Sequence, residues 1–348
     1  MLEHRDTKQQ SFFGNYLYDK VVSKEHLLRK ISKAIDFSFI KDECADLYCL
    51  DNGRPGWSPV LMFKTVFLQF LYDLSDYAIE EELNDRLSFK MFIGLEVEEA
   101  PPDHSSISRF RDRLGVERFK AIFNRMVELA RSHGIVSDKL HIVDATDIKA
   151  KVDLYRLKKE HKDTEPKTYL DNHSPDKDAR TGRKFKGTRF YGYQAHTVMD
   201  AQSEIIVNVD TAPGDVKEHT QLEPLVKRIP APKVLTADKA YDCQQNHALL
   251  ARRRIRNAIM LKKNHTVSYL KEHIKRVCNT AKQYRLLVEH KFAEGKRHHG
   301  LGKARYWGLA KVRIQTYITA TVMNVKRIIK FLFSGISLPL IPLRAVAT

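Results

Sequence analysis

The chain has 348 residues, of which 43% are hydrophobic, enough for one large or two modest domains with buried cores. Disorder is therefore excluded. The longest apolar stretches, residues 60–71 and 328–343, are interrupted by lysine, glutamine, serine or proline, so neither is expected to span a membrane. The cysteines form no CxxC pair and the first residues are charged, so neither a zinc finger nor a signal peptide is expected.

Positive charge is large and unevenly placed. The formal net charge is +17. Residues 1–136 contain 19 Lys/Arg against 22 Asp/Glu, a net −3. Residues 149–190 contain 13 against 7, a net +6, and residues 251–305 contain 16 against 3, a net +13. Since neutralisation of phosphates supplies most non-specific affinity for nucleic acids, this arrangement predicts a polyanionic partner.

Residues 1–136 are predicted to form a small all-helical domain, with residues 1–20 as an arm that docks late or on a partner. Ser58 and Pro59 provide an N-cap and a first-turn proline, and Ser75 can cap the next helix. Helices joined by short turns suggest a helix-turn-helix-like unit. The helical runs are 22–40, 58–71, a run after Ser75, 105–114, which stops at Gly115, and 117–132.

A basic cluster is the exception in this slightly negative domain. It includes Arg109 and Arg111, together with Arg113, Arg118, Lys120 and Arg125. The cluster is interpreted either as a face for DNA phosphate or as an ordinary solvated helix face.

From residue 137 to 333 the pattern changes to strands that alternate with helices. A hairpin is predicted around the polar turn 199–203. Residues 150–190 are polar and are predicted to be an insertion or mobile loop, and 334–348 a C-terminal tail. Strands are predicted at 140–143, 192–198, 204–209, 233–237 and 257–261, and helices at 244–253, 282–291 and 309–333. An early hairpin followed by this alternation is the element order of an RNase H-like α/β fold.

Three segments place an acidic residue where a metal-dependent DNA-cutting site needs one. Asp144 and Asp238 each follow an apolar strand, and Glu289 lies on a predicted helix between basic residues. Carboxylates brought together repel each other unless divalent cations hold them. A pair of such cations can activate water and stabilise the leaving oxygen of a phosphodiester.

These segments resemble the DDE transposases of bacterial insertion sequences, of the insertion-sequence-five type. Val143-Asp-Ala-Thr146 resembles the first-aspartate block, Leu235-Thr-Ala-Asp-Lys-Ala-Tyr241 the second, and Arg285-x3-Glu289-x6-Lys296 the third. Residues 174–180 and 191–196 resemble the stretch between the first two aspartates, and residues 61–114 the N-terminal helical region. Two positions depart from the family pattern, which usually has glycine at Ala240 and, in cut-and-paste relatives, tyrosine at Lys282. A hairpin intermediate that rests on that tyrosine is therefore not predicted.

The resemblance implies an RNase H-like sheet flanked by helices and a transposase that nicks terminal inverted repeats and joins the 3′-hydroxyl ends to target DNA. It implies two Mg²⁺ ions, with Mn²⁺ as a substitute, held by Asp144, Asp238 and Glu289. It also implies double-stranded DNA as partner, a homodimer in the synaptic complex, no membrane association, and a bacterial cytoplasmic location on the nucleoid. The alternatives are a metal-dependent nuclease without strand transfer and a non-catalytic DNA-binding protein derived from a transposase.

Other residues carry secondary predictions. Asp147 is the second choice for the first carboxylate, and Glu294 or Glu272 for the third, whereas Asp242 is expected to be a helix N-cap. Arg285 and Lys296 fall on the same helix face as Glu289 and are predicted to bind phosphate, as are Lys239 and Arg297. His196 is interpreted either as an accessory residue that positions phosphate or as a structural histidine.

Overall fold

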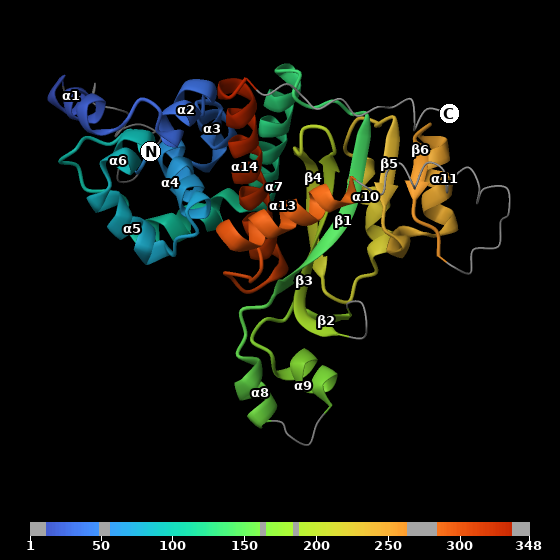
Figure 1. The fold of residues 1–348 in the computed structure, drawn as a ribbon. Helices are drawn as coiled ribbons and strands as arrows, with labels where there is room; N and C mark the ends of the chain where they lie inside the picture. Colours follow the sequence, from blue (N-terminus) through green and yellow to red (C-terminus); the bar gives the residue numbers. More distant parts are fainter. Residues whose placement is uncertain (1–11, 49–55, 161–164, 184–187, 263–283, 336–348) are drawn as a thin grey trace. The chain divides into compact units, whose positions relative to one another are not determined.

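The computed structural model describes residues 12–48, 56–160, 165–183, 188–262 and 284–335 (Figure 1). Contacts divide the chain into two compact units, one running to Ile122 and including Ile328–Ile336, the other containing Phe123–Arg327. The division falls inside one long helix, α7 (His104–Ser132), earlier than the predicted boundary at residue 136. The predicted tail beyond residue 335 lies outside the described residues.

The first unit is helical, as the spacing of its apolar residues predicts. Aromatic side chains contribute to its core, where the Phe37 ring contacts Phe63, Phe67 and Phe92. Ser75 accepts a hydrogen bond from Ala78 N–H at 3.0 Å, as predicted for an N-cap. Its helices are α1 (Phe12–Val21), α2 (Leu27–Ala34), α3 (Phe39–Glu43), η1 (Ala45–Leu47), α4 (Pro59–Leu71), α5 (Asp76–Asp85), α6 (Leu87–Ile93) and the first part of α7.

One local prediction for this unit is wrong and another is confirmed. Residues 12–21 belong to a docked helix rather than to an arm, because Tyr18 is buried and its hydroxyl donates to the Leu95 carbonyl at 2.8 Å. The predicted stop at Gly115 is confirmed as a break in α7, where φ is +68°. A left-handed backbone of this kind favours glycine.

The second unit is built on a six-stranded mixed sheet. β1 (Leu140–Lys149) pairs antiparallel with β3 (Arg189–Asp200) on one side and parallel with β5 (Val234–Ala237) on the other. The hairpin β3–β4 and the parallel neighbours of β1 confirm the RNase H-like mixed sheet flanked by helices. The remaining strands are β2 (Arg180–Arg183) and β4 (Ile206–Pro213), both paired with β3, and β6 (Arg256–Ile259), paired with β5.

Helices cover both faces of this sheet. Val288 of α13 (Arg285–His298) packs with Ile142 of β1, and α13 crosses in front of β1 in Figure 1. On the opposite face, Asn208 of β4 donates to the Leu225 carbonyl of α10 (Leu222–Val226) at 2.7 Å. The other helices are η3 (Glu218–Gln221), which leads into α10, η4 (Lys239–Tyr241), α11 (Gln244–Arg252) and α14 (Leu309–Phe333).

The prediction that residues 150–190 form an irregular insertion is wrong in part. This stretch contains α8 (Leu154–Glu160), α9 (Pro166–His173) and β2. Leu157 and Leu170 of the insertion belong to one buried cluster with Tyr193 of β3, so the insertion packs on the core of the sheet. The insertion needs few apolar residues of its own to be ordered, because those it has pack against the end of β3.

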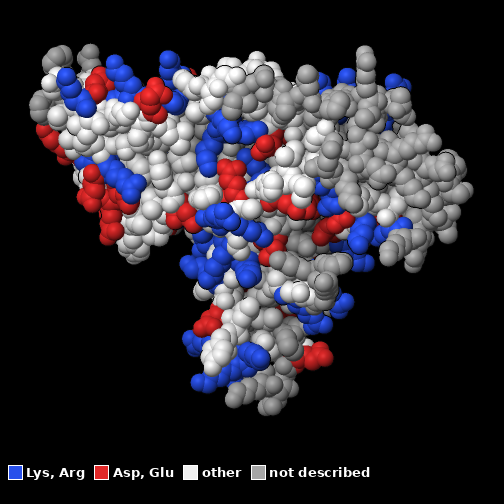
Figure 2. Space-filling model, in the orientation of Figure 1, with Lys and Arg blue, Asp and Glu red and all other residues white. Residues whose placement is uncertain are grey.

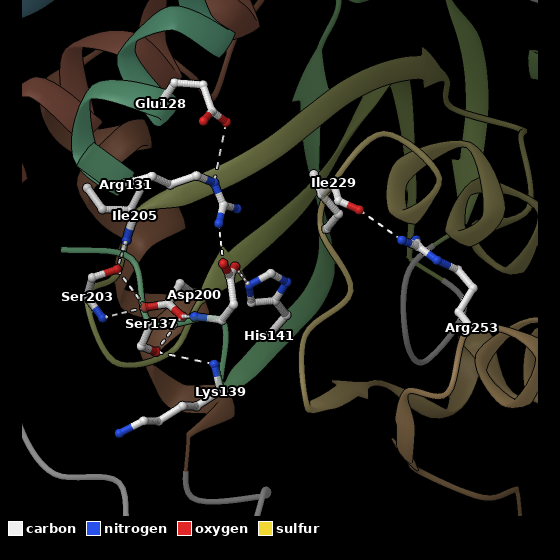
Figure 3. Close-up of polar contacts among 11 residues, drawn as sticks. Glu128, Arg131, Ser137, Lys139, His141, Asp200, Ser203, Ile205, Ile229 and Arg253 are labelled. Carbon is white, nitrogen blue, oxygen red and sulfur yellow. Dashed lines mark hydrogen bonds and ion pairs between the residues drawn. The ribbon is translucent and has the colours of Figure 1, made fainter. Parts of the chain in front are cut away.

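A dense polar network fixes the start of β1 (Figure 3). Asp200 accepts hydrogen bonds from Ser203 N–H and Oγ at 2.9 and 2.7 Å, and from Ser137 Oγ at 2.9 Å. Asp138 accepts from Arg131 and from His141 Nε2, the latter at 2.9 Å. Burial alone would raise the pKa of Asp138, but the His141 hydrogen bond and Arg131 hold it below its usual value. Each carboxylate here is therefore stabilised by protein donors.

Candidate active site

Asp144 and Asp238 are brought together where two parallel strands part. β5 ends at Ala237, opposite Val143, whereas β1 continues to Lys149. Asp238 follows β5 directly and its carboxylate accepts from Lys239 N–H at 2.6 Å. Both aspartates line one cavity of about 830 Å³. Ligands bind at the carboxyl ends of strands at such a point in α/β sheets.

The strand prediction at Asp144 was too short. Asp144 lies within β1 rather than at its end, because β3 pairs with β1 as far as Lys149. An extended backbone predicts that Asp147, three residues along, points to the other side of the strand, but Lys296 of α13 contacts it at 2.9 Å. The cavity nevertheless reaches both aspartates, since β1 has lost its β5 neighbour at this level.

The carboxylate of Asp144 is short of protein partners. Burial is the main cause that raises its pKa to about 6, and the charges of Asp238 and Glu289 raise it further. The Ala145 N–H, at 2.9 Å, and Arg285 oppose this rise. An ionised Asp144 is therefore costly in the protein alone, and a bound cation would remove that cost.

Helix α13 carries Glu289, the third predicted acid, and two basic residues that contact aspartates. Arg285 Nη1 lies 3.6 Å from Asp238 Oδ1, and Lys296 Nζ lies 2.9 Å from Asp147 Oδ1. Glu289 lies between them on α13, exposed, and its charge acts on Asp144. The predicted sharing of one helix face by Arg285, Glu289 and Lys296 is thus consistent with these contacts.

The alternative acids have other partners. Glu294 pairs with Lys291 at 3.0 Å and Lys326 at 2.9 Å. Burial opposes its ionisation, but these two lysines lower the pKa of Glu294 to about 2. Asp242 is not the predicted N-cap; its carboxylate binds His247 at 2.7 Å and the Lys262 N–H at 2.7 Å, and Cys243 occupies the cap position of α11. Glu272 lies outside the described residues.

His196 is fully buried in β3, opposite Ala145, and neither ring nitrogen has a partner among the described residues. Burial lowers its pKa to about 4, so the ring is neutral at physiological pH. In this environment a neutral ring has no charge to offer phosphate. The structural interpretation of His196 therefore agrees better with its surroundings than the accessory one.

Sequence patterns did not indicate two further residues near the aspartates. Glu218 of η3 lines the same cavity as Asp144 and Asp238. Tyr241 of η4 is fully buried, and its hydroxyl has no hydrogen-bond partner in the described part of the chain. Burial and then the charges of Glu218, Asp144 and Asp238 raise the pKa of Tyr241 well above its usual value.

The donor set fits a hard divalent cation. Carboxylate oxygens are the ligands that Mg²⁺ prefers, and an unpartnered buried hydroxyl beside them suits a water ligand. Over the ranges that the structure describes, no three His, Cys, Asp or Glu side chains already converge closely enough to enclose an ion. The chemistry of the residues thus fits the cation, with some side-chain movement needed to close around it.

Basic side chains surround this cavity. Lys239, Lys262 and Arg183 line it, and Arg297 is exposed in the last turn of α13. Figure 2 shows Lys and Arg side chains gathered over the C-terminal end of α13 and the segment after it. A second cavity of about 690 Å³ shares Phe190 with the first and carries four cations, Lys149, Lys151, Arg189 and Lys303, against one acid, Asp153.

The two arginines predicted for DNA binding in the first unit have different environments. Arg109 is exposed, and in the described part of the chain its guanidinium donates hydrogen bonds only to Ser105 and Ser106 of its own helix turn. Arg111 is 4% exposed and makes a bidentate pair with Asp76 at 2.7 and 2.6 Å. The prediction that Arg111 faces phosphate is therefore wrong, because its guanidinium is buried and already paired with the Asp76 carboxylate.

Two family models match the chain. Residues 137–325 match the family described as Transposase DDE domain, and residues 16–113 match Transposase domain (DUF772). A cryo-EM structure of the piggyBac transposase synaptic complex with hairpin DNA aligns with 90% of this chain and 75% of its own, at 11% identity and a TM-score of 0.45. No described helix is long and apolar enough to cross a membrane. The chain belongs to the DDE transposases, metal-dependent enzymes that cut DNA and transfer its strands.

Proposed function

We propose that this transposase nicks the terminal inverted repeats of an insertion sequence and joins the freed 3′-hydroxyl ends to target DNA. Water attacks the phosphodiester at each end and releases a 3′-hydroxyl. That hydroxyl then attacks a target phosphodiester, so one bond forms as another breaks and no covalent protein–DNA intermediate is needed. The observation that carries this proposal is the single cavity shared by Asp144 and Asp238 beside Arg285.

Asp144, Asp238 and Glu289 are the proposed ligands of two Mg²⁺ ions, with Mn²⁺ as a substitute. When bound, such ions supply an activated water and stabilise the leaving oxygen. Arg285 already contacts Asp238 and can hold this carboxylate or a DNA phosphate in a bidentate manner. Lys296, from the same helix, pairs with Asp147 at 2.9 Å.

The DNA is proposed to follow the basic surface around the two cavities. Lys239, Arg297 and the cations of the second cavity would contact phosphates near the scissile bond. Trp307 is 55% exposed, and its indole N–H donates to the Lys151 carbonyl at 2.7 Å, which leaves an aromatic surface beside that cavity for a base. Arg109 in the first unit would contribute to end binding, and a homodimer would hold two ends.

The test is cleavage of DNA that carries the gene's own flanking ends, with Mg²⁺, with EDTA, and with Glu289→Gln. Metal-dependent nicks with 3′-hydroxyl ends, lost in Glu289→Gln, support the proposal. A supercoiled target in the same reaction distinguishes transfer from hydrolysis, since joined products are absent for a simple nuclease. Binding of the ends without any cut, under several metals, would favour a non-catalytic DNA-binding protein.

A further inference from the structure

Glu218 lies at the wall of the cavity that holds Asp144 and Asp238, although it is distant from both in sequence. It opens η3, which leads directly into α10. Glu218 therefore directly precedes the helix that covers the face of the sheet opposite α13, the helix that carries Glu289.

The surroundings of Glu218 contain repulsion and no compensating donor. Burial, then the charges of Asp144 and Asp238, raise its pKa to about 7. In the part of the chain that the structure describes, no donor makes a hydrogen bond or ion pair with its carboxylate. Its neighbour Glu223, exposed on α10, instead pairs with Lys227 at 2.8 Å. Asp144 and Asp238 lie close enough to Glu218 to raise its pKa, and such a group of carboxylates is unfavourable without a cation.

The hydroxyl of Tyr241 gives an independent indication that a ligand belongs here. It is fully buried, lies in the field of Glu218, Asp144 and Asp238, and has no hydrogen-bond partner among the described residues. A buried hydroxyl without a hydrogen-bond partner is unfavourable. A partner that arrives with the ligand, such as a water bound to a cation, removes this cost.

We propose that Glu218 is a fourth acidic residue of the cation-binding cavity and helps Asp144 and Asp238 to hold the divalent ions. The inference rests on the proposed function, since it concerns the same site. It adds a residue from η3 that none of the three acidic sequence segments contains. Glu218 acts as a carboxylate donor to the cation or to one of its water ligands.

The test is Mn²⁺ binding to the full-length protein without DNA, measured by isothermal titration calorimetry and by the Mn²⁺-induced shift in Tm. Glu218→Gln is expected to weaken Mn²⁺ binding by roughly 10- to 100-fold, the range seen when a residue that supports metal ligands is lost. Glu218→Asp, which keeps the charge, should recover part of the affinity. Glu223→Gln is the matched control and should bind as the wild type does.

The metal-free Tm shows whether Glu218→Gln is folded, and removal of a repelling charge predicts a Tm equal to or above that of the wild type. Wild-type affinity in a folded Glu218→Gln protein, with binding weakened in Asp144→Asn, would overturn this inference alone. Unchanged Mn²⁺ binding in both Glu218→Gln and Asp144→Asn would instead overturn the cation site of the proposed function.

Discussion

The carboxylates at the start of β1 and those along its middle have opposite environments. At the start, Asp138 and Asp200 each accept hydrogen bonds from several protein groups, and Arg131 supplies a compensating charge (Figure 3). In the middle, Asp144 faces Asp238 across a cavity and has one backbone donor. Asp138 and Asp144 are nevertheless close in the chain, one just before β1 and one within it.

The number of protein donors around a carboxylate distinguishes residues that stabilise the fold from residues that need a bound ligand to offset their charge. A buried charge with its donors in place stabilises the folded protein, whereas one without them reduces stability until a counter-ion binds. Sites of function are where such unfavourable charges are retained. The comparison therefore assigns Asp138 and Asp200 to structure and supports the proposed role of Asp144 and Asp238 as cation ligands.

The largest expected effect is on DNA cleavage. Asp144→Asn and Asp238→Asn should each lower the rate of metal-dependent cleavage by on the order of 10²- to 10³-fold, because each removes a preorganised charge at the reacting phosphate. The rate is measured on DNA that carries the flanking ends. Asp215→Asn, at an exposed aspartate of the same unit, is the control and should cleave normally. Cleavage at the wild-type rate in Asp144→Asn would contradict the assignment.

At the start of β1 the expected effect is on stability instead. Arg131→Gln should lower the free energy of unfolding by about 2 to 3 kcal/mol, since it removes a charged hydrogen bond to Asp138. Chemical denaturation measures the loss, and Mn²⁺ affinity should stay unchanged. Arg252→Gln, at an exposed arginine, should have no effect on either quantity. Weakened Mn²⁺ binding in Arg131→Gln would mean that the two groups are not independent.

A smaller and pH-dependent effect is expected for Asp144 in the metal-free protein. Its pKa is raised to about 6 in the folded state, from an ordinary value of 3.8, so ionisation of Asp144 costs stability as pH rises from about 4 to 6. Asp144→Asn should therefore be more stable than the wild type by on the order of 1 kcal/mol above pH 6. The gain should shrink as pH falls and be absent below pH 4. Thermal unfolding with EDTA measures it, and a gain independent of pH would rule out this cause.

The smallest effect is expected on DNA affinity, for the basic residues around the cavity. Replacement of one phosphate contact, as in Arg297→Gln, should reduce the slope of log affinity against log salt by about 0.9. Fluorescence anisotropy with labelled DNA at several salt concentrations measures the slope. Lys330→Gln, at an exposed lysine of α14, should keep the wild-type slope. An unchanged slope in Arg297→Gln would remove this residue from the DNA surface.

Part of the site could be predicted because local sequence determines it. An apolar run followed by an aspartate marks Asp238 at the end of β5, and the period of α13 aligns Arg285, Glu289 and Lys296. The mixed sheet followed from the hairpin and the alternation of strands and helices. The insertion-sequence-five type and the metal-ligand roles stay predictions.

Other parts depend on tertiary contacts that a pattern does not contain. Glu218 lies in a polar stretch without periodicity, and only the return of the chain past β4 brings it to the cavity. The length of β1 follows from its pairing with β3, not from its own polar residues. Arg111 resembles its exposed neighbour Arg109 in sequence, but the partner Asp76 that buries it is 35 residues away.

The most direct measurement is an anomalous difference map from crystals of the full-length protein soaked in Mn²⁺. The predicted result is Mn²⁺ within about 2.5 Å of the carboxylates of both Asp144 and Asp238, inside their shared cavity. Mn²⁺ bound elsewhere, or an absence of bound ions at concentrations that support cleavage, would contradict the assignment of this cavity as the catalytic centre.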